Sequence, residues 1–175
     1  MHTFAPLSAS IRASLSCLDS RRLHKQSIEA LQIYLLLVDA PLDDGRPRTG
    51  HRHHPVLRMW RGHLNALRHY IHEAVWLTSQ RPTKQRNPDG SYRCYNNLKM
   101  RDNLIRYNIP LSQDEFRQLE GPLNHGLSTG MPWWWGREDV HRSHRRALYR
   151  KSSVLYPQFQ SDDVSGGGGW GYVWP

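Results

Sequence analysis

Residues 19–38 carry the pattern that most restricts the fold, because apolar residues recur there at helical spacing opposite a polar stripe. Asp19 is a favourable N-cap for a helix that runs to about Val38. At 100° per residue, the apolar side consists of Leu23, Ser27, Leu31, Tyr34, Leu35 and Val38. The polar stripe consists of Arg22, Lys25, Gln26 and Glu29. From Ile33 onward the segment is apolar nearly all round, so the stripe runs toward the interior.

Further helical segments follow along the chain. Helical periodicity predicts a second long helix from about Val56 to Thr78 and a basic helix from about Arg137 to Lys151. Shorter helices are expected within residues 1–16, within 97–107 and from the capping box Ser112/Glu115. Residues 39–55 and 81–92 are predicted to be loops because they are rich in turn-forming residues.

No segment shows a clear alternating strand pattern, so the predicted fold class is mainly α. We expect a compact single-domain helical fold with two long helices and irregular basic loops. The predicted domain covers residues 1–163. Residues 164–175 form a Gly-rich lead, which we expect to be flexible, and a Trp-rich C-terminal tail.

Composition excludes several classes of protein. The two cysteines, Cys17 and Cys94, are too few for a disulfide scaffold and are expected to be structural. The longest apolar run, Ile33 to Val38, is far shorter than the roughly 20 residues of a membrane span. We expect an intracellular monomer that is not associated with a membrane.

The charge points to a polyanionic partner. Lys and Arg total 24 against 15 Asp and Glu, a net charge of +9. On the basic helix, His141, His144 and Arg145 share one face, which suits contacts with nucleic-acid phosphates. A solvated cationic face is the alternative.

Glu29 is the sharpest catalytic candidate in the sequence. Arg22 and Lys25 precede it by seven and four residues on the same helix face, so they favour its ionised form. The cations could hold phosphates while Glu29 acts as a general base or stabilises a cationic intermediate. The alternative is an ordinary exposed ion pair.

Histidines and tryptophans leave two questions open. The run HRHHP (51–55) suggests metal binding. However, His69 and His72 of the following helix are three residues apart, with no acidic residue placed as in a zinc-protease signature. We therefore expect no metal and no cofactor. The run 133–135 could stack on bases or pack on the core.

Three stretches resemble the pyrimidine-dimer DNA glycosylase family, the phage-type endonuclease V family. They are LDSRRLHKQSIEAL (18–31), GHRHHPVLRMWRGHLNAL (50–67) and the tail HRSHRRALYRK…YVWP. The resemblance implies an all-helical domain that acts on damaged double-stranded DNA. In this family a free N-terminal amine attacks the sugar C1′, releases the base and leaves an imine that resolves by strand cleavage. The essential glutamate of the first long helix corresponds to Glu29.

The same resemblance assigns the remaining site residues. The amine belongs to Met1 or His2, and the flipped nucleotide or its phosphates meet Arg22, Lys25 and Gln26. His54, Arg58 and Trp60 match the second motif and are expected at the DNA. The chain has His2 where the phage enzyme has threonine, and Ile28 where the family prefers arginine.

Other mechanisms stay open at this point. Lys25 could form the imine in place of the terminal amine, or water could attack directly, giving a glycosylase without lyase activity. A different class of protein, a non-catalytic nucleic-acid-binding protein, would use the same basic surface. A His-rich, metal-dependent nuclease is a third possibility.

Overall fold

The fold is mainly α, which confirms the predicted class. The computed structural model describes residues 3–86, 92–94, 102, 104–107, 109, 130–164 and 171–175. The helices are α1 (Ile11–Ser16), α2 (Ser20–Leu37), α3 (Pro55–Trp60), α4 (Leu64–Ser79), α7 (Glu138–Lys151) and α8 (Gln160–Val164), with the short 3-10 helix η1 (Pro157–Phe159). Within this described part of the chain, no helix is long and apolar enough to cross a membrane.

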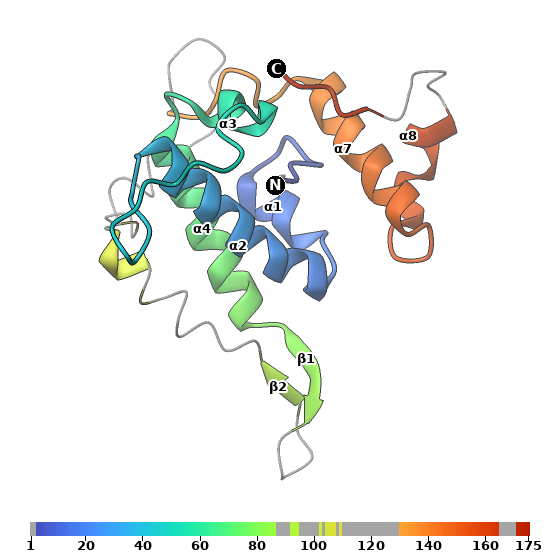
Figure 1. Cartoon of the computed structure of the whole chain (residues 1–175). Coiled ribbons are helices and arrows are strands. Elements are labelled where there is room, and N and C mark those ends of the chain that lie inside the picture. The colour runs from blue at the N-terminus through green and yellow to red at the C-terminus, as the bar shows by residue number, and fades with distance from the viewer. Residues whose placement is uncertain are drawn as a thin grey trace.

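The centre of the molecule is the pair α2 and α4, which pack side by side, with α1 against α4 (Figure 1). As predicted, Asp19 caps α2, and its carboxylate accepts hydrogen bonds from the backbone N–H groups of Arg21 and Arg22. Leu23 and Ile33 are fully buried on the inward side of α2. The N-terminal segment lies between this helix pair and α7, so helices distant in sequence meet around it (Figure 1).

The second long helix predicted for residues 56–78 is two helices, α3 and α4. Arg61 has extended backbone angles, and Gly62 has φ +82°, in the left-handed region that ends a helix and favours glycine. The apolar period continues across the break, and therefore the pattern alone did not show it.

The loop predicted for residues 81–92 contains a strand. β1 (Pro82–Arg86) pairs antiparallel with β2 (Tyr92–Cys94), and the hairpin projects from the end of α4 (Figure 1). Polar strand residues carry no hydrophobic alternation, so the prediction missed them. The predicted turn at Pro88-Asp89-Gly90, most of the helix predicted at 97–107 and the helix from Ser112 lie outside the described residues.

The ends of the chain pack on the helices. In the N-terminal segment Phe4 and Ala5 are buried. At the C-terminus Tyr172, Val173 and Trp174 are packed against the core. Nearly all of the Gly-rich lead that was predicted to be flexible lies outside the described residues. The short helix predicted within residues 1–16 is α1, and the basic helix predicted at 137–151 is α7.

Candidate active site around Glu29

Glu29 lies at the inner end of the polar stripe on α2. Its side chain is 15% exposed, and Lys25 Nζ, on a 70% exposed side chain, is 3.5 Å from Oε1. Gln26, between them in the stripe, is fully buried. The stripe therefore runs from solvent into the interior, as the sequence predicted, and gives a carboxylate with limited access to water.

Gln26 connects this stripe to the N-terminal segment. The backbone N–H of Phe4 donates a 2.8 Å hydrogen bond to Gln26 Oε1. The Tyr70 hydroxyl lies 2.7 Å from the same oxygen and 2.9 Å from the Phe4 carbonyl oxygen, and its proton serves one of these acceptors at a time. Burial raises the pKa of Tyr70 well above its usual value, so the hydroxyl keeps that proton.

Thr3 is also fixed, and it uses a residue that the motif had assigned to DNA. Trp60 Nε1 donates a 2.8 Å hydrogen bond to Thr3 Oγ1, and both residues are buried. The burial of Trp60 and Gln26 does not fit the expectation that they contact DNA. Both instead hold residues 3–4 next to α2, because a buried N–H group needs an acceptor and a buried amide needs a donor.

Three residues of α7 hold the next part of the N-terminal segment. The Ala5 N–H donates to His144 Nδ1 at 2.9 Å, and its carbonyl oxygen is 2.6 Å from His141 Nδ1. Arg145 Nη1 donates to the Pro6 carbonyl at 3.0 Å.

These positions correct the expectation that the three side chains form a phosphate-binding face. His141 and His144 are fully buried, and the Arg145 side chain is only 14% exposed. Arg145 is also paired with Asp162 at 2.8 Å and with Glu138. Sequence spacing placed the residues on one helix face correctly but could not show that this face points inward.

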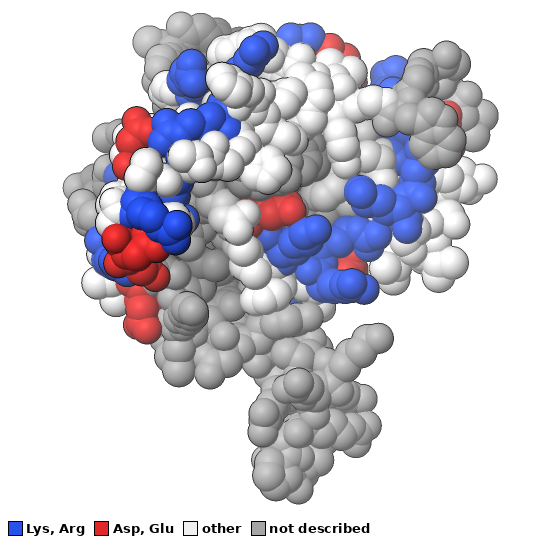
Figure 2. Space-filling model, viewed as in Figure 1, with Lys and Arg blue, Asp and Glu red and all other residues white. Residues whose placement is uncertain are grey.

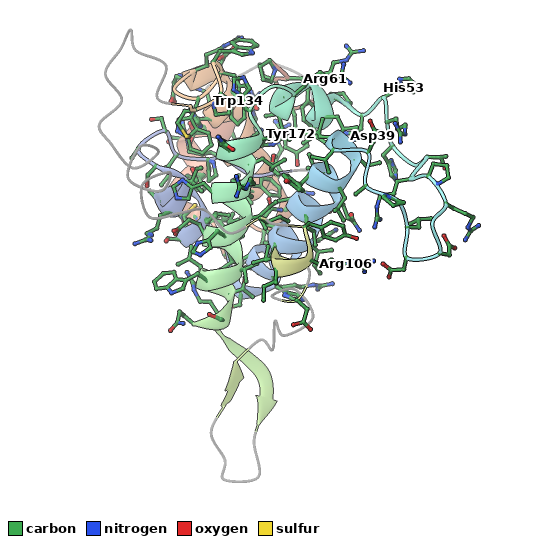
Figure 3. The ribbon with its side chains drawn as sticks, turned by 90° about the vertical axis from the view of Figure 1, so that its left-hand side faces the viewer. Asp39, His53, Arg61, Arg106, Trp134 and Tyr172 are labelled. Atoms are coloured by element: carbon green, nitrogen blue, oxygen red, sulfur yellow. The ribbon has the colours of Figure 1, made fainter. Side chains whose placement is uncertain are left out.

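His54 and the C-terminal residue Tyr172 lie within electrostatic range of Glu29. The ring of Tyr172 is 6.2 Å from that of Phe4, and the ring of Trp174 is 5.7 Å from that of His54. Burial, and next the charge of Glu29, raise the pKa of Tyr172 to about 12. Figure 3 shows Tyr172 among the helices. The sequence did not lead us to expect Tyr172 and Trp174 at this site, although the aromatic composition of the tail was a usable signal.

His54 has a structural role as well as its place in the site. It is the N-cap of α3, and its Nδ1 accepts a 3.2 Å hydrogen bond from the Val56 N–H. Burial lowers its pKa, as do nearby positive charges, while the charge of Glu29 acts in the opposite direction. The charge of Glu29 is the smallest of these influences, and it places the His54 ring within electrostatic range of that carboxylate.

Arg22 is held at the entrance of α2. Its Nη1 is 2.6 Å from Asp19 Oδ2, and its guanidinium lies 5.2 Å from the centre of the Tyr156 ring. The Tyr156 hydroxyl donates to the same Asp19 oxygen at 2.5 Å. Arg22 thus has a fixed orientation and remains 22% exposed, which leaves it available to an anion.

Basic side chains gather on the face that includes α2 and α7 (Figure 2). Helix α3 contributes one further exposed cation, Arg58. Apart from the inward-facing Arg145, the cations of α2 and α7 are Arg21, Arg22, Lys25, Arg142, Arg146, Arg150 and Lys151. Such a surface suits a phosphate backbone.

Core packing, one of the two predicted roles of the tryptophan run, holds for two of its three residues. Trp134 and Trp135 pack in the core, and Trp134 Nε1 donates to the Met59 carbonyl at 2.7 Å. Trp133 is 62% exposed, with the Arg137 guanidinium 5.6 Å from its ring centre.

The histidine-rich loop lies at the outer edge of the fold. Figure 3 shows His53 there, and His51 and His53 are both exposed. Among the described residues, no group of three or more His, Cys, Asp or Glu side chains is arranged to hold a metal ion.

The match to a family model covers the elements that build this site. Residues 1–84, which include α1 to α4, match the model of a family described as pyrimidine dimer DNA glycosylase. In these residues the chain is similar to that family, as the motifs suggested. The helix α7 and the C-terminal tail lie outside the match. Comparisons with curated proteins and with solved structures gave no match.

Proposed function

We propose that the protein excises damaged bases from double-stranded DNA and cleaves the resulting abasic strand, with pyrimidine dimers or another lesion as substrate. The observation that carries this proposal is the 2.8 Å hydrogen bond from the Phe4 N–H to Gln26, three residues before Glu29 on α2. An amine on Met1 or His2 stays within about 8 Å of Thr3, because each residue extends the chain by at most about 3.6 Å. We infer that the terminal amine reaches the Glu29 carboxylate from this anchored position.

The reaction begins at the sugar of an extruded nucleotide. The neutral amine attacks C1′ while the C1′–N bond to the base breaks, and the base leaves with the bonding electron pair and takes up a proton. The attached amine then loses one proton, and the C1′–O4′ bond breaks. The released O4′ takes up a proton, which opens the sugar ring and leaves a protonated C1′ imine. Removal of a C2′ proton then expels the 3′ phosphate, and water hydrolyses the imine to restore the amine.

Glu29 has two tasks in this scheme. Its carboxylate stabilises the positive charge that develops on the sugar and then on the iminium nitrogen. It also accepts protons from the amine and from C2′. The low exposure of Glu29 strengthens the electrostatic effect, because less water screens the charges. Free α-amino groups in general have a pKa near 8, which leaves a neutral, nucleophilic fraction at neutral pH.

The surrounding cations suit the binding of the duplex. We expect Arg22, Lys25 and Arg58, which are at least partly exposed on α2 and α3, to contact phosphates on either side of the extruded nucleotide. Extrusion costs a few kcal/mol, which contacts with the phosphate backbone offset. We infer an intracellular enzyme that needs no cofactor for this chemistry.

Borohydride trapping tests the proposal. The protein is incubated with ultraviolet-irradiated, abasic and undamaged duplexes in the presence of a chelator, reduced, and mapped by mass spectrometry. An adduct at Met1 or His2 supports the proposal, and an adduct at Lys25 moves the nucleophile. If no adduct forms and no base is released, the proposal fails in favour of a non-catalytic binder. Cleavage that the chelator abolishes would instead indicate a metal-dependent nuclease.

A further inference from the structure

Two buried histidines of α7 contact the backbone polar groups of Ala5. Its N–H donates to His144 Nδ1 at 2.9 Å, and its carbonyl oxygen lies 2.6 Å from His141 Nδ1. Both imidazole rings are fully buried. The Nδ1 atoms of the two histidines therefore contact the N–H and the carbonyl group of the same residue, Ala5.

These two hydrogen bonds require opposite tautomers of the two histidines. His141 Nε2 accepts from the Gly136 N–H at 3.0 Å, so its proton is on Nδ1 and is donated to the Ala5 carbonyl. His144 accepts at Nδ1, so its proton is on Nε2. Burial lowers the pKa of both rings, to about 3 for His144, which keeps them neutral. A neutral ring is what each of these contacts needs, since a protonated imidazole has no acceptor.

The two hydrogen bonds to Ala5 also fix the register of the N-terminal segment. A slip by one residue that put Pro6 in the place of Ala5 would present no N–H group to His144. The preceding residue, Phe4, is bonded to Gln26 of α2 on the other side of the segment. Adjacent residues are thus anchored to different helices, which prevents both sliding and rotation of the segment.

We propose that His141 and His144 are positioning residues, which hold the N-terminal segment in register so that its amine meets the sugar C1′ beside Glu29. This inference rests on the proposed function. It assigns part of the catalytic arrangement to α7, outside the residues that match the family model. Precise placement matters because a displacement of about 1 Å can reduce a rate on the order of 100-fold.

Three substitutions of His144 test the inference in the full-length protein. His144→Asn keeps a hydrogen-bond acceptor on Cγ, where Nδ1 was attached. His144→Gln moves the acceptor one atom further along the side chain, and His144→Leu removes it. Leu148→Ala is the matched control, since Leu148 is a fully buried apolar residue of the same helix. Each protein is assayed well below its unfolding temperature.

The readouts are the single-turnover rate of imine trapping on an abasic duplex and the affinity for a duplex carrying a non-reactive abasic analogue. We expect His144→Asn to trap within about threefold of the wild-type rate. His144→Gln and His144→Leu should lose on the order of 10- to 100-fold in rate while binding DNA within about twofold. Leu148→Ala should retain the wild-type rate. If the Leu variant fails to fold, the Asn and Gln pair carries the comparison.

The contradicting results separate this inference from the proposed function. If the wild type traps DNA at its N-terminal residue and the Asn and Gln variants trap equally fast, the positioning role is wrong and the proposed function stands. A loss by Leu148→Ala equal to that of His144→Gln would also overturn the positioning role. If the wild-type adduct is on Lys25, or if no adduct forms, both the amine assignment and this inference are wrong.

Discussion

Phe4 and Gln26 are joined by a 2.8 Å hydrogen bond that brings the start of the chain to α2, one helical turn before Glu29. Gln26 also contacts the Tyr70 hydroxyl at 2.7 Å, so one buried amide serves α2, α4 and the N-terminal segment. The candidate site therefore depends on a polar network inside the core as well as on its own carboxylate.

Replacing Gln26 by Leu should destabilise the protein by about 1–3 kcal/mol, because it removes the acceptor that serves the Phe4 N–H. Urea denaturation measures the free energy of unfolding. Gln32→Leu on the exposed side of the same helix is the control and should change it by less than about 0.5 kcal/mol. Equal effects of the two substitutions would show that the network adds no stability.

The ion pair between Arg12 and Glu73 should make the free energy of unfolding depend on pH. Burial raises the pKa of Glu73, but hydrogen bonds from Arg12 outweigh it and hold the pKa at about 2, below the usual 4.5. A lowered folded-state pKa gives stability that is complete above about pH 4.5 and is lost as the pH falls toward 2. The contribution at neutral pH is on the order of 2–3 kcal/mol.

We therefore expect Arg12→Gln to reduce the free energy of unfolding strongly at pH 6 and much less at pH 3. Denaturation curves at both pH values measure the difference from the wild type. Arg21→Gln, an exposed residue of α2, serves as the control. A difference between wild type and Arg12→Gln that is the same at both pH values would contradict the assignment.

Gly62→Ala should cost about 1 kcal/mol, because Gly62 has φ +82° and an added Cβ meets no atom within 4 Å. The expected loss of stability therefore comes from the backbone conformation alone. Gly50→Ala, where the added Cβ is equally free and φ is not positive, should be close to neutral. Thermal unfolding of both variants checks the pair, and equal melting temperatures would refute the explanation of the break between α3 and α4.

Arg58→Gln should reduce the slope of log affinity against log salt concentration by about 1 if Arg58 contacts one phosphate. Fluorescence anisotropy with a duplex at several salt concentrations measures this slope. Arg46→Gln is the control, because Arg46 is exposed but pairs with Asp44 at 2.7 Å. A slope unchanged by Arg58→Gln would remove that residue from the proposed interface.

The sequence predicted α2 well because both its cap and its stripe are local patterns. Asp19 and the spacing of Lys25, Gln26 and Glu29 determine a helix whose polar face turns inward. The break at Gly62 was not predictable in this way, since a single left-handed residue leaves the apolar period intact.

The roles of the α7 residues were also beyond sequence reasoning. A dense run of Arg and His is compatible with a phosphate-binding face, yet His141 and His144 are buried against Ala5. Their partner is 136 or more residues away in the sequence, so the contact depends on tertiary packing. The same holds for Tyr172, which reaches the site from the C-terminal end.

The most direct test of the account is base release from ultraviolet-irradiated duplex by wild type and Glu29→Gln, with DNA affinity measured in parallel. Glutamine keeps the size of Glu29 but removes its charge and replaces one acceptor oxygen with an NH2 donor. The account predicts that Glu29→Gln loses base release and strand cleavage while its affinity for DNA stays within a few fold. Base release by Glu29→Gln at the wild-type rate would contradict the central claim that this carboxylate carries the chemistry.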